Sequence, residues 1–123
     1  MANNVLIVDD SAIIRKMVAR NLAMADIDLG EVHLAANGRE ALEKLEQHWI
    51  DVVLADINMP VMNGLELIAE MNRRELTATI PVVIISTERS KERIAALKEM
   101  GVKAYINKPF TPEEFATVIK GLL

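Results

Sequence analysis

Five polar residues have the side chains that a phosphoryl-transfer site requires. Each follows a short apolar run: Asp9 and Asp10 after residues 5–8, Asp56 after 52–55, Ser86 after 82–85 and Lys108 after 103–106. Carboxylates hold a hard divalent metal ion, while a hydroxyl and an ammonium group can hold phosphoryl oxygens. Whether these side chains act together depends on where the fold places the ends of the apolar runs.

Each of these residues also has a simpler interpretation when it is taken alone. Asp9 and Asp10 would suit the first turn of a helix, where a carboxylate caps free N–H groups and complements the helix dipole. Asp56 could be a turn residue, and Lys108 with Pro109 could form a turn before the last helix. The functional interpretation therefore rests on convergence of the whole group.

The apolar runs alternate with amphipathic helical segments. Strands are predicted at 5–8, 32–36, 52–55, 82–85 and 103–106, and helices at 11–25, from 37 with a capping box to Glu40, at 65–74, at 93–100 and from 111. Strict alternation predicts an α/β fold, a doubly wound parallel sheet of five strands with helices on both faces. The flavodoxin-like order 2-1-3-4-5 suits such a sheet and makes the strands ending at residues 8 and 55 neighbours.

Three carboxylates at one edge of the sheet would repel one another and raise each other's pKa values unless a cation joined them. Mg²⁺ suits a site of few carboxylates and several waters. Asp56 would then be the nucleophile that forms an acyl phosphate, while Ser86 and Lys108 each take a phosphoryl oxygen. This convergence predicts a magnesium-dependent phosphoryl acceptor.

Composition excludes several other classes of protein. The chain of 123 residues suits a single domain, has no cysteine, and carries a formal charge of −4, which disfavours direct nucleic-acid binding. It contains no apolar run of the ~18–20 residues that a membrane span needs and no signal peptide, so we expect a cytoplasmic protein.

The motifs of related catalytic and cofactor-binding folds are also missing. The adjacent pair Asp9 and Asp10 differs from the Asp-x-Asp of aspartate-nucleophile phosphohydrolases, and would repel the phosphate of a flavin. Neither dinucleotide-binding nor P-loop glycine patterns occur. His33, His48 and Trp49 are interpreted as structural, surface or packing residues. We therefore do not expect a turnover enzyme.

Four blocks of sequence resemble the receiver domain of bacterial response regulators. They are Val5-Leu6-Ile7-Val8-Asp9-Asp10-Ser11, the stretch from Asp56 through Asn58-Met59-Pro60 to Asn63-Gly64, Ser86, and Lys108-Pro109-Phe110. The resemblance covers residues 4–123 and is closest to chemotaxis receivers with no attached output domain. It implies one response regulatory domain over residues 1–123 and the same strand order.

The resemblance also implies a role for each matching residue. Asp56 would be phosphorylated; Asp9, Asp10, Asp56 and the Asn58 carbonyl would bind Mg²⁺, Asp9 largely through water. Ser86 and Lys108 would hold the phosphoryl group. Ser86 and Tyr105 would form the switch, and Asn58 and Glu88 would tune dephosphorylation. Two mild departures are Ser86 in place of a frequent threonine and Asn63 in place of a frequent aspartate.

A sensor histidine kinase is the implied phosphodonor and a protein is the implied target, with a phosphatase as a further candidate partner. Three outputs stay open: control of a flagellar motor switch protein, a phosphorelay intermediate, or a receiver cut from a DNA-binding regulator. We expect a monomer that binds neither nucleic acid nor membrane.

Two structural expectations complete the prediction. The Lys108–Pro109 bond should be cis, because Lys108 must turn back over the site. The face formed by the predicted helix at 93–100, the strand at 103–106 and the helix from 111 should change shape on phosphorylation. Its expected exposed residues are Lys91, Glu92, Lys98, Lys103 and Lys120.

Overall fold

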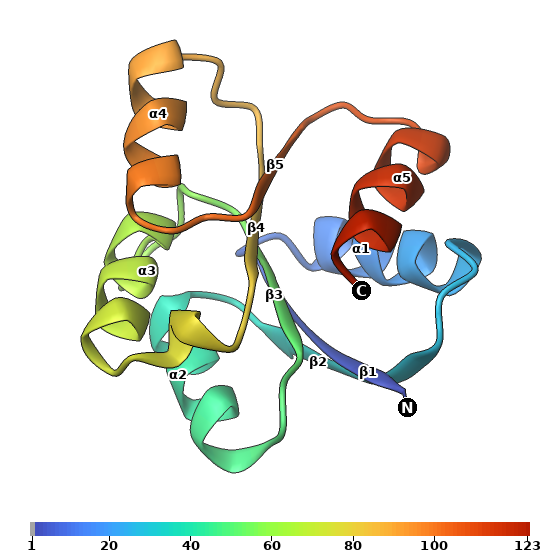
Figure 1. The fold of residues 1–123 in the computed structure, drawn as a ribbon, viewed down its shortest axis with the longest axis horizontal. Helices are drawn as coiled ribbons and strands as arrows, with labels where there is room; N and C mark the ends of the chain where they lie inside the picture. Colours follow the sequence, from blue (N-terminus) through green and yellow to red (C-terminus); the bar gives the residue numbers. More distant parts are fainter. Residues whose placement is uncertain (1) are drawn as a thin grey trace.

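A computed structural model describes residues 2–123 and contains one parallel sheet of five strands in the order β2-β1-β3-β4-β5 (Figure 1). In chain order the elements are β1 (Asn3–Val8), α1 (Ala12–Met24), β2 (Leu29–Ala35), α2 (Gly38–Gln47), β3 (Val52–Ala55), α3 (Gly64–Arg73), the short 3₁₀ helix η1 (Leu76–Ala78), β4 (Val82–Ser86), α4 (Lys91–Glu99), β5 (Ala104–Asn107) and α5 (Pro112–Leu122). The predicted fold class and strand order are confirmed.

Helices cover both faces of the sheet: α1 and α5 lie on one side, and α2, α3 and α4 on the other (Figure 1). Side chains of β1 alternate between the two layers, because successive residues of a strand point to opposite faces. Leu6 and Val8 belong to the core beneath α2 and α3, while Val5 and Ile7 belong to the core beneath α1 and α5. Burial on both faces explains why this strand is a continuous apolar run.

The helix starts are capped by side chains, with one correction to the prediction. Asn37 caps α2 by accepting from the Glu40 N–H, but the Glu40 carboxylate accepts from the N–H of Ala36 at 3.0 Å. The complete reciprocal capping box forms instead at α3, between Asn63 and Glu66. The asparagine at this departure from the family pattern therefore keeps the capping function.

The bounds of several elements differ from the prediction; β1, for example, begins at Asn3. β2 begins at Leu29 because Asn3 pairs with it across an irregularity in the β1–β2 ladder, which the mixed sequence here does not indicate. α4 begins at Lys91, capped by Ser90, and β5 spans 104–107. The short 3₁₀ helix η1 was not predicted. It follows Glu75, whose left-handed backbone (φ of 61°) separates it from α3.

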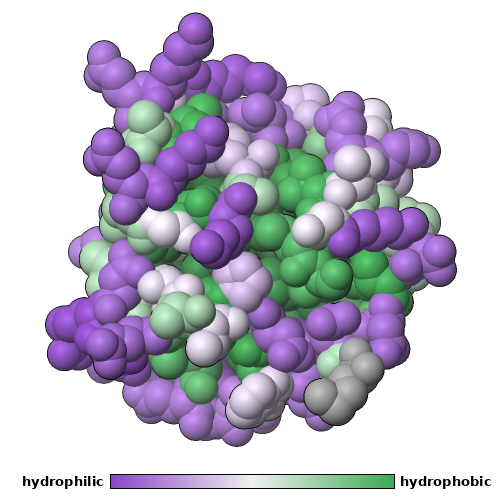
Figure 2. Space-filling view, in the orientation of Figure 1, coloured by the Kyte–Doolittle hydropathy of each residue, from purple (hydrophilic) through white to green (hydrophobic). Residues whose placement is uncertain are grey.

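α4 is the most thinly anchored of the five α-helices in residues 2–123, since Leu97 is its one fully buried residue. Its polar side chains project at the upper left of the face in Figure 2. The side chains expected to be exposed on α4, β5 and α5 and the link before β5 are exposed: Lys91, Glu92, Lys98, Lys103 and Lys120.

Trp49 does not pack in the core as the sequence suggests. Its side chain is 78% exposed, and its ring N–H donates to Oδ1 of Asp51 at 2.9 Å. The hydrogen bond holds the ring against the loop before β3 without burying it. Within the described residues, every helix is too short or too polar to cross a bilayer.

Candidate functional site

The three aspartates lie together at the carboxyl end of the sheet. β1 and β3 are neighbours in parallel register, and Val8 pairs with Ala55 at their ends. The residues that follow leave the sheet side by side, and carboxylate oxygens of Asp9, Asp10 and Asp56 lie within 4.8 Å of one another. The predicted convergence of the three carboxylates is present in the structure.

Lys108 reaches this acidic cluster from the end of β5. Its ammonium nitrogen is 3.1 Å from Oδ2 of Asp9 and 3.7 Å from Oδ2 of Asp56. Its backbone N–H donates to the Ser86 carbonyl at 2.9 Å, which ties the loop to the end of β4. The Lys108–Pro109 bond is cis, as predicted. One cation therefore faces two of the three carboxylates.

Asp9 is held by four hydrogen bonds in a buried position, one of them from its backbone N–H to the Ala35 carbonyl at 3.0 Å. Its Oδ1 accepts from the N–H of Ser11 at 2.9 Å, its Oδ2 accepts from Lys108, and its carbonyl accepts from Nη1 of Arg15 at 2.7 Å. Asp10, in contrast, is exposed. The two adjacent aspartates thus differ: one is fixed within the site and the other faces solvent.

The charged form of Asp56 is disfavoured where it stands. Burial raises the pKa of its carboxyl, and the charges of Asp9 and Asp10 raise it further; Lys108 and the N–H of Ile57, which donates to Oδ1 at 2.8 Å, oppose this only in part. The net shift of the Asp56 pKa is upward, because the ammonium group of Lys108 and the N–H of Ile57 do not offset burial. The donor set of three hard carboxylates therefore fits a divalent ion such as Mg²⁺, which would relieve this repulsion.

Ser86 and Tyr105 meet through the backbone of Glu88. The fully buried Ser86 hydroxyl oxygen accepts from the N–H of Glu88 at 3.2 Å, and the Tyr105 hydroxyl donates to the Glu88 carbonyl at 2.6 Å. Burial raises the pKa of the Tyr105 phenol. The two predicted switch residues are thus linked through one residue between them.

The residues predicted to tune dephosphorylation, Asn58 and Glu88, follow the ends of β3 and β4. Asn58 is exposed in the loop after Asp56. The Glu88 carboxylate is turned toward the start of α4, where Oε1 accepts from the N–H of Ser90 at 3.0 Å and Oε2 lies 4.0 Å from Nε of Arg93. Neither contact carries the Glu88 side chain over the Asp56 carboxylate.

Two arginines were missed by sequence reasoning. Arg15 bonds the Asp9 carbonyl, and Arg89 donates to the Lys108 carbonyl at 3.3 Å. Both fix the backbone of a site residue from outside the cluster. The position of Arg15, one turn into the helix that follows Asp9, was the available signal; for Arg89 the sequence offers none.

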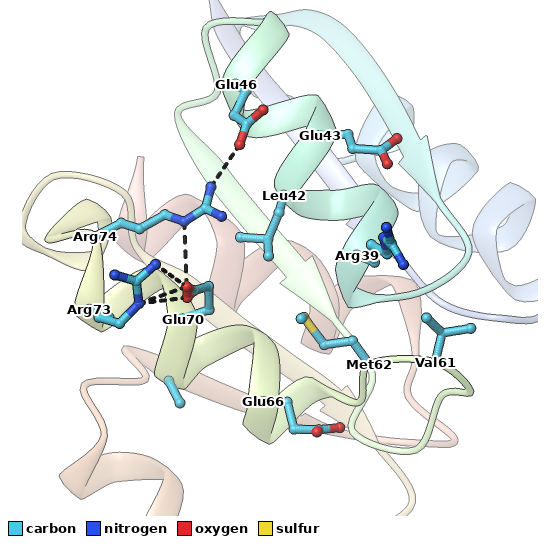
Figure 3. Close-up of a pocket in the computed structure, with 11 residues that line it drawn as sticks. Arg39, Leu42, Glu43, Glu46, Val61, Met62, Glu66, Glu70, Arg73 and Arg74 are labelled. Carbon is cyan, nitrogen blue, oxygen red and sulfur yellow. Dashed lines mark hydrogen bonds and ion pairs between the residues drawn. The ribbon is translucent and has the colours of Figure 1, made fainter.

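A separate groove of about 750 Å³ lies between α2 and α3. Figure 3 shows Arg74 at one end, bonded to Glu46 of α2 at 2.9 Å and 3.7 Å from Glu70 of α3. Met62 and Val61 lie toward its other end. None of the predicted site residues lines this groove, so the acidic cluster is the candidate site.

Comparison with known families agrees with this geometry. The model of the response regulator receiver domain matches residues 5–120. The chain belongs to the response regulator receiver family. It is accordingly a CheY-like receiver domain of a two-component response regulator.

Its relatives include free receivers and longer regulators. Chemotaxis protein CheY1 of Helicobacter pylori is 37% identical over 109 residues, covering 88% of this chain and 86% of that protein. The structure of chemotaxis response regulator CheY4 of Vibrio cholerae has a TM-score of 0.88 and 36% identity, with complete coverage of both chains. Probable transcriptional regulator ycf29 of Porphyra purpurea is 33% identical, and this chain spans 57% of its length.

Proposed function

We propose that Asp56 accepts a phosphoryl group from a phosphohistidine of a sensor histidine kinase. The observation that carries the proposal is the Lys108 ammonium group, 3.1 Å from Asp9 and 3.7 Å from Asp56, beside a cluster of three carboxylates. Carboxylates with no function could simply be hydrated, without a lysine or a buried hydroxyl beside them. A buried hydroxyl at Ser86 and a lysine aimed at the same carboxylates supply what a transferred phosphoryl group needs.

In the transfer, an Asp56 carboxylate oxygen bonds to phosphorus as the phosphorus–nitrogen bond of the phosphohistidine breaks. The imidazole departs with the bonding electron pair and takes up a proton. Lys108 exchanges part of its contact with Asp56 for a phosphoryl oxygen, and the Ser86 hydroxyl donates to another. Later hydrolysis restores the carboxylate, so the protein acts as a phosphoryl acceptor with self-dephosphorylation and not as an enzyme that turns over a substrate.

Receiver domains generally bind Mg²⁺ at their acidic pocket, and the residues of this chain fit that ion. Asp9, Asp10 and Asp56 would hold it with the Asn58 carbonyl, Asp9 largely through water because Lys108 already contacts it. The bound ion supplies charge neutralisation for the carboxylates and for a phosphoryl oxygen. The upward pKa shift of Asp56, caused first by burial and further by the charges of Asp9 and Asp10, supports this assignment, because a bound cation would favour the ionised carboxylates.

Chemotaxis is the output that the relatives favour, with a flagellar motor switch protein as the target. CheY1 and CheY4 match this chain along 86% and 100% of their own lengths, respectively. A second candidate is the regulation of transcription, because ycf29 matches over its receiver-sized portion alone. The two outputs differ in the target bound by the phosphorylated form.

The acceptor is tested by incubating the protein with Mg²⁺ and a small phosphodonor and measuring its intact mass. One phosphoryl group should be gained, labile to base and to hydroxylamine as an acyl phosphate is. Asp56→Asn should abolish the gain, and a chelator should suppress it in the parent. Asp26→Asn is the matched control, because Asp26 is exposed and its one described ion pair is with Lys120. Full labelling of the Asp56 variant would refute the assignment.

A further inference from the structure

A second group of potential metal ligands lies on the edge strand. Glu31 and His33 project from β2, and His48 follows the end of α2. The two imidazole rings stack with centroids 4.0 Å apart and an angle of 25° between their planes. Nε2 of His33 is 3.0 Å from Oε1 of Glu31. One potential ligand atom from each of the three residues lies within 4.8 Å of the others.

This group is separate from the acidic cluster. His33 pairs with Leu6 of β1, three residues before Asp9. A strand rises about 3.3 Å per residue, so the two groups are roughly 10 Å apart along the strand direction alone. The neighbouring β1 side chain at this level, Leu6, belongs to the core beneath α2. His33 therefore lies on the face of the sheet that α2 covers, where His48 can reach it.

We propose that Glu31, His33 and His48 bind a first-row transition-metal dication, with Zn²⁺ as the ion to test. Two imidazoles and one carboxylate form a borderline donor set that suits Zn²⁺, Ni²⁺ or Cu²⁺. Mg²⁺ demands oxygen ligands, so the two groups select different ions. Three protein ligands leave a fourth position for water.

One distance suits this assignment directly, and the two stacked imidazole rings would turn to reach the same ion. Zinc–nitrogen and zinc–oxygen bonds are about 2.0–2.2 Å long, which places neighbouring ligand atoms roughly 3 Å apart. The 3.0 Å separation of the Glu31 oxygen and the His33 nitrogen already has this value. An ion pair alone would need only these two residues. His48 adds a second imidazole from another element, and a metal would fasten the end of α2 to the edge of the sheet.

The test uses the fact that the chain contains two histidines and one tryptophan. Zn²⁺ is titrated into the whole protein in saturating Mg²⁺, and the ring signals of both histidines are followed by NMR. We expect both rings to shift together and to saturate at one equivalent. Trp49 adjoins His48, so Cu²⁺ at the same site should quench the single tryptophan.

Ligand variants separate this site from the acidic cluster. His33→Gln and His48→Gln should each weaken Zn²⁺ binding at least about tenfold, the lower end of the loss seen when residues that support metal ligands are removed. Glu31→Gln, at an exposed position, should also weaken Zn²⁺ binding. Asp56→Asn should leave Zn²⁺ binding unchanged.

Three results would overturn the proposal. They are a shift of only one histidine ring, zinc affinity that survives the loss of both histidines, and zinc affinity lost in Asp56→Asn. The last would place the ion in the acidic cluster. Phosphoryl labelling of the histidine variants should match the parent, which shows that they fold.

Discussion

The Tyr105 hydroxyl donates to the backbone carbonyl of Glu88 across 2.6 Å. The N–H of the same residue donates to the Ser86 hydroxyl oxygen at 3.2 Å. Ser86 ends β4, the strand beside the one that leads to Asp56, and Tyr105 lies on β5. A movement of the Ser86 hydroxyl toward a phosphoryl oxygen therefore removes one bond from Glu88 and disturbs the residue that holds the Tyr105 ring.

A phosphate mimic should perturb NMR shifts along α4, β5 and α5, and Ser86→Ala should weaken that response. Converting a mostly inactive population to a mostly active one takes about 5 kcal/mol of differential interaction. Hydrogen bonds to charged groups contribute roughly 1.5–3 kcal/mol each, so loss of the hydroxyl removes a large part of this. Thr117→Ala, which removes an exposed hydroxyl that donates within α5, is the control and should respond normally. Shift changes confined to the surroundings of Asp56 would contradict the mechanism.

Asn58→Arg should lengthen the lifetime of the phosphorylated form several-fold, on the order of 1 kcal/mol in the hydrolysis barrier. Asn58 is exposed beside the acceptor, and Glu88 is held toward α4, so water has access to the phosphoryl group. A long cationic side chain would cover that access. Gln47→Arg adds the same charge at an exposed position of α2 and should leave the rate of phosphoryl hydrolysis unchanged. The decay of phosphorylated protein after removal of the donor measures both, and equal rates in the two variants would exclude shielding.

Asp56→Asn should raise the free energy of unfolding in a chelator at neutral pH, because the variant removes a carboxylate whose charged form is disfavoured in the folded protein. The folded-state pKa of Asp56 lies above its ordinary value, so the ionised carboxylate destabilises the fold above that pKa. This penalty disappears as the pH falls through the folded-state pKa and the group is protonated. The gain of the variant should therefore vanish in acid.

Adding Mg²⁺ to the same unfolding experiment should favour the parent over the Asp56→Asn variant. Mg²⁺ at ten times its dissociation constant should stabilise the parent by about 1.4 kcal/mol and the Asp56→Asn variant by less. Urea unfolding with and without Mg²⁺ measures both effects. Asp26→Asn should respond to Mg²⁺ as the parent does. A variant less stable than the parent in chelator would show that the Lys108 contact outweighs the repulsion.

Gly64→Ala should destabilise the protein by about 1–3 kcal/mol and reduce phosphoryl labelling. A Cβ at this position would overlap the backbone carbonyl oxygen of Asp56 and lie 2.9 Å from Cα of Ile57. Backbone atoms cannot rotate away, so the acceptor loop must shift. Gly121→Ala is the matched control, because a Cβ there meets nothing within 4 Å; it should be neutral or stabilise α5 by up to about 1 kcal/mol. Thermal unfolding and labelling of both variants provide the comparison.

The parts of the fold that follow from burial were predictable. β1, β3 and β4 are covered on both faces, so their sequences are continuous apolar runs with short links to helices. The strand order then places the ends of β1 and β3 together, and Asp9, Asp10 and Asp56 with them. The sequence could predict this much of the site because parallel strands end at one edge.

What the sequence missed depends on contacts between distant or irregular segments. β2 extends to Leu29 through pairing with Asn3, which no periodicity indicates. Trp49 is large and aromatic, yet a hydrogen bond to Asp51 holds it at the surface. The proximity of His33 and His48 arises from packing of α2 on β2, which brings residues of different elements together.

α4 is joined to the core mainly through Leu97, whereas the strands that carry the acceptor are buried on both faces. Elements with few buried contacts open at a lower free energy than the core does. Amide hydrogens of α4 should thus exchange with solvent well before those of β1 and β3. Loosening this single peripheral helix would leave the buried sheet intact, and substitutions at the exposed positions of α4 should have little effect on whether the chain folds. The surface of this helix can therefore vary in evolution with little loss of stability.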